Sequence, residues 1–174
     1  ALIAEISRTS VEDYIAGTLL APLGMKDTTM LTFERDMAYV CTPHEKDADK
    51  HFVPVPHFPY NRAHGPSSTL TSTLNDMNRW ALAHLQGALL QKETRTLAFS
   101  PQAQVPNNGE AICLSWFARQ QNRRTLFGHE GNDDGFRSSF WICPEEEAFL
   151  IVLSNLSNAP VKKISKELFN LLTA

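Results

Sequence analysis

Strand, turn and strand follow one another in the segment Leu126-Phe127-Gly128-His129-Glu130-Gly131-Asn132-Asp133-Asp134-Gly135-Phe136. An apolar lead-in precedes His129, glycines stand on both sides of it, and an acidic turn ends at a further glycine. Glycine weakens a strand interior and often marks a bulge or a close approach by a ligand or another backbone. Two interpretations follow: the glycines keep a strand edge clear for a ligand, or they only serve the hairpin turn.

More strands are predicted around this segment. Residues alternate with strand periodicity over 112–118 and 136–142, and residues 125–129 form a strand between them. The continuously apolar run 148–153 predicts a strand covered on both faces. Because only short turns separate successive strands, we expect an antiparallel meander.

Helices are predicted before and after this sheet. Apolar residues keep helical spacing over residues 11–20, 74–85 and 161–171. The fold class is therefore predicted to be α+β in a single domain. Residues 1–100 are expected to be mainly helix and loop, and residues 110–174 to form an antiparallel sheet of about three to four strands with the C-terminal helix packed on it.

The composition is that of an ordinary globular domain. The 174 residues are 43% hydrophobic and 20% charged, which suits one domain with a real core. A net charge of −3 without a long Lys/Arg run argues against a nucleic-acid partner. No apolar run approaches the ~20 residues of a membrane span. The odd count of 3 cysteines does not suit a disulfide framework, and one disulfide plus a free thiol stays open.

The first residues read as a fragment of a larger pattern. Residues 1–8 have the character of the last turns of a helix, with no initiator methionine, helix cap or signal-peptide charge block before them. We expect a cut through a longer protein, and a natural N-terminus produced by processing is the alternative.

Residues 25–60 carry little periodicity and several prolines. Such a long irregular stretch is either functional, as a lid or a binding wall, or a surface excursion. A zinc site is a further alternative, since residues of zinc-ligand type collect in and just after this stretch; they are Cys41, His44, His51, His57 and His64. Their spacing fits no standard zinc pattern, and His129-Glu130 lacks the HExxH spacing, so we expect no metal and no cofactor.

Four segments in this order carry a family resemblance: Leu20-Ala21-Pro22-Leu23-Gly24-Met25-Lys26-Asp27-Thr28, then residues 66–77, then Gly128-His129-Glu130-Gly131 with Gly135-Phe136, then Val152-Leu153-Ser154-Asn155. They resemble the PLGM-x-DT, P-A-G-G-L-x-S-T-x-N-D-L, G-H-x-G…GF and VLSN segments of the serine β-lactamase and penicillin-binding-protein superfamily, in its class C-like and esterase-like branch. The resemblance covers most of the chain and implies part of the β-lactamase/transpeptidase-like fold.

The nucleophile of that superfamily lies outside the resemblance. The superfamily places a Ser-x-x-Lys motif and a Tyr-x-Asn motif N-terminal to the PLGM segment, and these residues hold neither in a matching place. The nearest strings are Ser7-Arg8-Thr9-Ser10, which lacks the lysine, and Tyr60-Asn61, which lacks the spacer. The chain therefore resembles the C-terminal portion of such an enzyme.

The resemblance assigns residues to one wall of an acyl-transfer site. It implies that Asn132 donates its backbone N–H to the oxyanion and that Gly131 keeps the strand open to the substrate. His129 would hydrogen-bond the catalytic tyrosine or the carboxylate side of the substrate. Glu130 is placed with Gly131 among the substrate-binding residues, and its charge would favour the protonated ring of His129 if the two side chains approach.

Ser67 and Ser68 stand where the superfamily has glycines and are expected to be loop hydroxyls near the substrate. The implied function is hydrolysis of amide, ester or β-lactam bonds through an acyl-enzyme, with this chain inactive alone. A non-catalytic binding or scaffold module of the same fold is the alternative. Expected partners are a small-molecule or peptide substrate of the longer parent and a second copy, through surface that an absent half would leave uncovered. The superfamily implies a periplasmic or cell-envelope location in bacteria.

Overall fold

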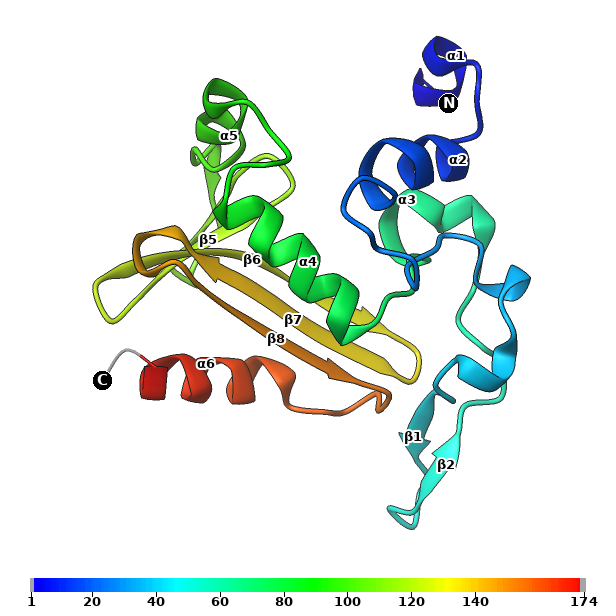
Figure 1. The fold of residues 1–174 in the computed structure, drawn as a ribbon. Helices are drawn as coiled ribbons and strands as arrows, with labels where there is room; N and C mark the ends of the chain where they lie inside the picture. Colours follow the sequence, from blue (N-terminus) through cyan, green and yellow to red (C-terminus); the bar gives the residue numbers. More distant parts are fainter. Residues whose placement is uncertain (1, 173–174) are drawn as a thin grey trace.

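A computed structural model describes residues 2–172, apart from the side chain of Pro66. Its centre is one six-stranded antiparallel sheet in which sequence neighbours pair throughout, in the order β3-β4-β5-β6-β7-β8 (Figure 1). The strands are β3 (Ala103–Gln104), β4 (Glu110–Ile112), β5 (Phe117–Gln121), β6 (Arg124–Asp133), β7 (Phe136–Cys143) and β8 (Ala148–Ser154). The predicted α+β class and the antiparallel meander are confirmed.

The strand predicted over residues 112–118 is instead two strands and a turn. β4 ends at Ile112 and β5 begins at Phe117, and between them the N–H of Cys113 donates to the carbonyl of Trp116 at 2.7 Å. Ser115 closes this turn with a left-handed φ of 63°. The extra turn, with the short strand β3, is why the sheet has six strands and not about three to four.

Helix α6 (Val161–Leu172) covers one face of the sheet along β7 and β8, as predicted (Figure 1). A buried cluster of Leu126, Trp141, Cys143 and Phe169 fills this layer, with Phe169 supplied by the helix. Phe169 is 2% exposed, so the apolar stripe of α6 is buried against the sheet at this residue.

Helix α4 (Leu74–Leu85) crosses the opposite face, and its Ala81 packs with Phe140 and Ile142 of β7 (Figure 1). The helix begins where Thr73 Oγ1 accepts the backbone N–H of Asp76 at 3.2 Å, which is the predicted N-terminal cap. Helix α5 (Lys92–Ala98) follows, and Phe99 after it joins the same apolar layer. The apolar strand β8 thus has α4 on one face and α6 on the other, as its composition predicted.

The N-terminal part is made of short elements beside the sheet. Helix α1 (Leu2–Ser7) is followed by α2 (Val11–Ile15), which Ser10 caps as predicted, and by the π-helical turn η1 (Ala16–Leu20). Ala1, part of the helix predicted over residues 1–8, lies outside the described residues. No helix within residues 2–172 is both long and apolar enough to cross a membrane.

The irregular stretch predicted over residues 25–60 contains only short pieces of regular structure. They are η2 (Thr32–Glu34), η3 (Met37–Tyr39), and a separate two-stranded hairpin of β1 (His44–Lys46) and β2 (Phe52–Pro54). The turn η4 (Arg62–His64) and the single-turn helix α3 (Gly65–Ser68) lead on toward α4. In Figure 1 this half lies beside the sheet end that carries the β6–β7 turn.

Candidate functional site

The β6–β7 end of the sheet has an open edge. β5 pairs with β6 only as far as Gly128, whereas β7 stays paired with β6 up to Asp133. Residues 129–133 therefore have a partner strand on one side, and no strand of the described chain pairs with them on the other. β6 is an inner strand at its start and an edge strand at its end, which is the kind of edge that the glycines suggested.

The hairpin register decides which backbone groups face this open edge. Asp133 and Phe136 are opposite each other across a two-residue turn, Asp134-Gly135, and the closing pair of such a turn exchanges both hydrogen bonds. Since backbone groups alternate in direction along a strand, Gly131 then faces β7 again, and Asn132 between them faces away from β7. The N–H of Asn132 thus points out of the open edge.

His129 lies at the same end of β6 with an exposed side chain. Strand alternation puts it on the face of Phe127, which is the face that α4 covers. Its Nδ1 is 2.6 Å from the carbonyl oxygen of Glu130, and because a carbonyl only accepts, this contact requires the proton on Nδ1. Nε2 is left to accept a hydrogen bond in the neutral ring, or to donate one in the charged ring.

The expected charge of Glu130 beside His129 is not found, because adjacent residues of a strand point to opposite faces. The Glu130 carboxylate instead lies on the α6 side, where its Oε1 accepts from Trp141 Nε1 at 2.9 Å and from Ser139 Oγ at 3.2 Å. The two side chains therefore do not approach each other, which was the condition for Glu130 to favour a protonated His129, and the Glu130 carboxylate lies away from the open edge.

Two of the glycines on β6 are required by their neighbours on β7. A Cβ added at Gly128 would lie 2.1 Å from the carbonyl oxygen of Phe140 and 2.5 Å from the Trp141 ring, which lies across this glycine. A Cβ at Gly131 would lie 2.1 Å from Ser138 Oγ. The flanking glycines thus allow close packing between the two strands, whichever ligand the edge receives.

The irregular stretch braces the β6–β7 turn. Pro43 packs against Gly135, which has a φ of 77° and could carry no side chain in this space, since an added Cβ would lie 2.2 Å from Pro43 Cβ. The N–H of His44 donates to the carbonyl of Asn155 at 2.9 Å, just after β8. Ser157 Oγ accepts from the N–H of Gly135 at 2.8 Å. This brace, formed by Pro43, His44, Gly135, Asn155 and Ser157, fixes the end of the sheet where the open edge lies.

Ser67 and Ser68 are exposed on α3, apart from β6. Ser67 Oγ donates to the carbonyl of His64 at 2.9 Å and so closes its own turn. An ion pair of 2.7 Å between Arg62 and Glu12 ties the segment before α3 to helix α2. The structure does not bring these two serines into contact with His129.

A buried carboxylate that the sequence analysis overlooked joins two of the recognised segments. Asp76 is 0% exposed, and its Oδ2 accepts from the backbone N–H of Asp27 and from Thr28 Oγ1, each at 2.8 Å. Its Oδ1 accepts from Arg79 at 2.9 Å. The sequence carries a signal for this contact, because the Asp-Thr pair of the first segment and the Asn-Asp pair of the second are both part of the family resemblance.

The candidate zinc ligands are spread along residues 41–64. His44 and His51 lie at opposite ends of the β1–β2 region, and Cys41 is exposed as a free thiol. Among residues 2–172 no three histidine, cysteine or acidic side chains come together in a group that could hold a metal ion. Cys113 and Cys143 are buried and take part in apolar clusters, as their strand-like surroundings predicted.

The sequence and the fold can now be compared with those of known proteins. Protein flp of Staphylococcus aureus is 25% identical over 172 residues, a match that covers 96% of this chain and 33% of that protein. A D-aminopeptidase of Brucella canis is 25% identical over 177 residues, covering 96% of this chain and 32% of that protein. The chain thus spans about a third of the length of these relatives.

Solved structures give the same result for the fold. The octameric penicillin-binding protein homologue from Pyrococcus abyssi superposes with a TM-score of 0.87 at 25% identity, over 99% of this chain and 40% of that one. The D-amino acid amidase from Ochrobactrum anthropi superposes with a TM-score of 0.80 at 18% identity, over 99% of this chain and 55% of that one. The sequence model of the Beta-lactamase family matches residues 1–174. This chain is therefore a member of the beta-lactamase family and corresponds to the C-terminal portion of its serine β-lactamase and penicillin-binding-protein relatives.

Proposed function

We propose that this chain forms one wall of the acyl-transfer site of a serine hydrolase. The observation that carries the proposal is the open edge at residues 129–133, where the N–H of Asn132 faces outward beside the exposed ring of His129. A strand edge with a free N–H is suited to an oxyanion, because the donor is fixed in place before the charge develops.

In this proposal the two groups have different tasks. The N–H of Asn132 stabilises the oxyanion, and Gly131 leaves the strand open for the substrate to lie alongside. The free Nε2 of His129 accepts from or donates to a tyrosine hydroxyl or the substrate. The serine nucleophile and its base come from a Ser-x-x-Lys segment that the 174 residues do not contain, so this chain alone does not turn over substrate.

For the substrate we propose an amide bond, with ester and β-lactam bonds as the wider class. Two of the relatives carry the names D-aminopeptidase and D-amino acid amidase, which supports an amide next to a D-residue. A histidine at this position carries less fixed positive charge than a lysine, which suits substrates without a carboxylate at that end.

A chimera tests the proposal, in which the Ser-x-x-Lys half of a family member precedes residue 1. A fluorophosphonate probe should label the chimera and leave the 174-residue chain unlabelled. Asn132→Pro deletes the backbone donor and should slow amide hydrolysis by about 10²- to 10³-fold. Asn132→Ala keeps the N–H and is the matched control, with a rate close to that of the parent chimera.

Either of two results would contradict the proposal. Labelling of a serine within the 174 residues would show a nucleophile inside this chain. Equal rates for Asn132→Pro and Asn132→Ala would show that the backbone donor has no part in catalysis. A chimera that folds but is never labelled would favour the second candidate, a non-catalytic binding module of the same fold.

A further inference from the structure

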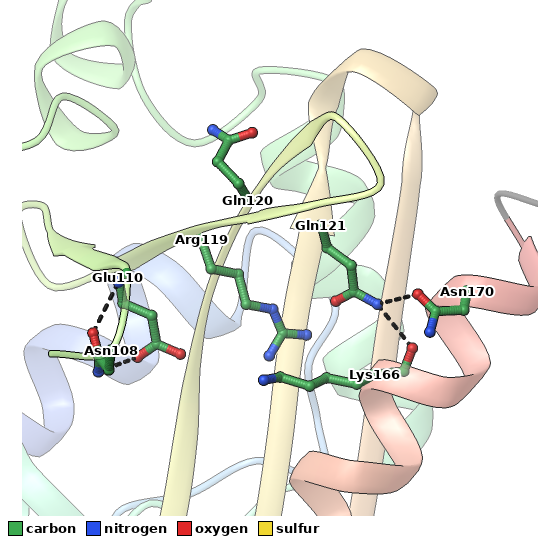
Figure 2. A pocket seen from close by; sticks show the side chains of 8 residues that line it. Asn108, Glu110, Arg119, Gln120, Gln121, Lys166 and Asn170 are labelled. Atoms are coloured by element: carbon green, nitrogen blue, oxygen red, sulfur yellow. Dashed lines mark hydrogen bonds between the residues drawn. The ribbon is translucent and has the colours of Figure 1, made fainter.

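A polar cavity of about 260 Å³ lies on the α6 side of the sheet, away from the face of His129. β5, the turn before β4, and α6 form its walls (Figure 2). Figure 2 shows the side chains of Arg119 from β5 and Lys166 from α6 reaching toward each other across it. The residues that line it are Asn108, Gly109, Glu110, Arg119, Gln120, Gln121, Lys166 and Asn170.

Arg119 lies at the bottom of this cavity with all of its donors unused. Its side chain is 4% exposed, and none of its three nitrogens has a hydrogen-bond partner in the structure. Its nearest acid, Glu130, is 3.9 Å away, beyond hydrogen-bond distance. Buried guanidinium groups without partners are costly, because five N–H donors have lost their water.

Stacking explains how Arg119 is held without using those donors. The central carbon of its guanidinium lies 3.7 Å from the centroid of the Trp141 ring. A stacked guanidinium is stabilised through its face, and its N–H groups point outward in its own plane. The Trp141 indole thus holds the Arg119 guanidinium so that its edge, a planar fork of N–H donors, faces the cavity. Desolvation lowers the pKa of Arg119, and the nearby acids Glu130 and Glu110 raise it.

The charges around the cavity leave one cation in excess. Three cations, Arg119, Lys162 and Lys166, are set against two carboxylates, Glu110 and Glu130. Glu110 is already paired with Lys162 at 3.3 Å and hydrogen-bonded to Asn108. Glu130 already accepts from Trp141 and Ser139. Like charges on Arg119 and Lys166 face the same space, and an anion between them would remove their repulsion.

We propose that this cavity is a binding site for a small monocarboxylate, held by the fork of Arg119 and capped by Lys166. A carboxylate matches a guanidinium edge with two parallel hydrogen bonds, and one negative charge balances the excess. Glu110 in the cavity wall and Glu130 beside Arg119 disfavour a dianion. The Oε1 of Gln121 is buried without a partner, so a hydroxyl or amino group next to the carboxylate would find an acceptor there. The site is independent of the acyl-transfer proposal, since it lies on the other face of the sheet.

The test is a titration of the protein with sodium acetate and sodium lactate, followed by the NMR signal of the Arg119 Nε–H. Sodium chloride at equal ionic strength and sodium phosphate are the comparison salts. We expect a saturable shift with both carboxylates, tighter for lactate, and none that saturates with chloride. Lys166→Gln should weaken binding about three- to fivefold. Lys163→Gln is the matched control, because Lys163 is on the same helix but pairs with Glu167, outside the cavity.

One further variant keeps the test independent of folding. Arg119→Lys retains the charge and loses the fork, so it should fold and bind at least tenfold more weakly. The proposal is overturned if chloride and acetate give the same response, or if Lys166→Gln and Lys163→Gln bind equally well. It is also overturned if phosphate binds more tightly than acetate near neutral pH, since the charge balance would then be wrong.

Discussion

His84 is a residue whose protonation is strongly altered by the fold. It is 5% exposed among Trp80, Phe99 and Trp116, and neither ring nitrogen has a hydrogen-bond partner. Desolvation by this aromatic surround lowers the pKa of His84 from 6.5 to about 4. The ring is therefore neutral in the folded protein over the whole physiological range.

The lowered pKa of His84 makes the free energy of unfolding depend on pH. Above pH 6.5 the ring is neutral in both states and has no effect; below it the unfolded chain takes up a proton that the folded chain refuses. The free energy of unfolding should therefore fall by about 3 kcal/mol between pH 6.5 and pH 4, and this term should level off below pH 4. Urea denaturation at several pH values measures the fall.

The variant His84→Phe separates this term from other acid effects. It should remove most of the fall between pH 6.5 and pH 4, since phenylalanine has no proton to take up. His57→Gln, at an exposed position, removes one histidine and should leave the fall intact. A profile that His84→Phe leaves unchanged would mean that other groups cause the loss.

At the scale of elements, Asp76 joins the start of α4 to the segment before η2. We expect Asp76→Asn to lower the free energy of unfolding by about 2–3 kcal/mol, because the buried network loses its negative charge and one of its two acceptor oxygens. Urea denaturation measures this loss. Asn75→Ala, on the exposed neighbour, should change it by less than about 0.5 kcal/mol. Equal effects of the two variants would show that the Asp76 contacts are not needed to hold the segments together.

The elements with strong periodicity could be predicted from sequence. Strand β7 and the helices α4 and α6 have a clear period, and β8 is continuously apolar, so the positions of these elements can be predicted. The turn between β4 and β5 could not be predicted. It depends on a left-handed backbone conformation at Ser115, and serine does not signal that conformation as glycine or asparagine would. For the candidate site, His129 and Asn132 were named from a resemblance, but which way the Asn132 N–H faces follows only from the hairpin register.

Glu130 shows the opposite case, in which the sequence alone already determines where the side chain points. Neighbouring residues of a strand point to opposite faces, so a strand over this segment already separates Glu130 from His129. Its hydrogen-bond partner Trp141 and the nearby guanidinium of Arg119, 3.9 Å away, are each 11 residues from it in the sequence, and they become its neighbours only through the pairing of β5, β6 and β7. Such cross-strand contacts need the register and cannot be read from local pattern.

At the scale of the whole molecule, the outer edge of β8 is a site where another chain could pair. Within residues 2–172, β8 pairs with β7 alone, and its seven residues Ala148–Ser154 carry no charge. An uncharged open edge favours pairing with another chain. We therefore expect the 174-residue chain to form a homodimer through β8, with twice the monomer mass in light scattering.

The variant Leu153→Lys places a charge on this edge at a side chain that is 44% exposed, and it should give a monomer. Leu114→Lys changes an equally exposed leucine, 47%, in the turn between β4 and β5, and should leave the dimer intact. A clean monomer for the unaltered chain would contradict the prediction.

The brace at the β6–β7 turn also bears on the order in which the molecule opens. The sheet is assembled from hairpins between sequence neighbours, whereas the brace joins His44 and Asn155 across 111 residues. The entropy of closing a loop grows with its length, so the brace costs more to form than any one hairpin of the sheet. It rests on a few hydrogen bonds at the surface. We therefore expect local opening to begin at the brace and to reach the open edge of β6 while the core between α4 and α6 is still closed.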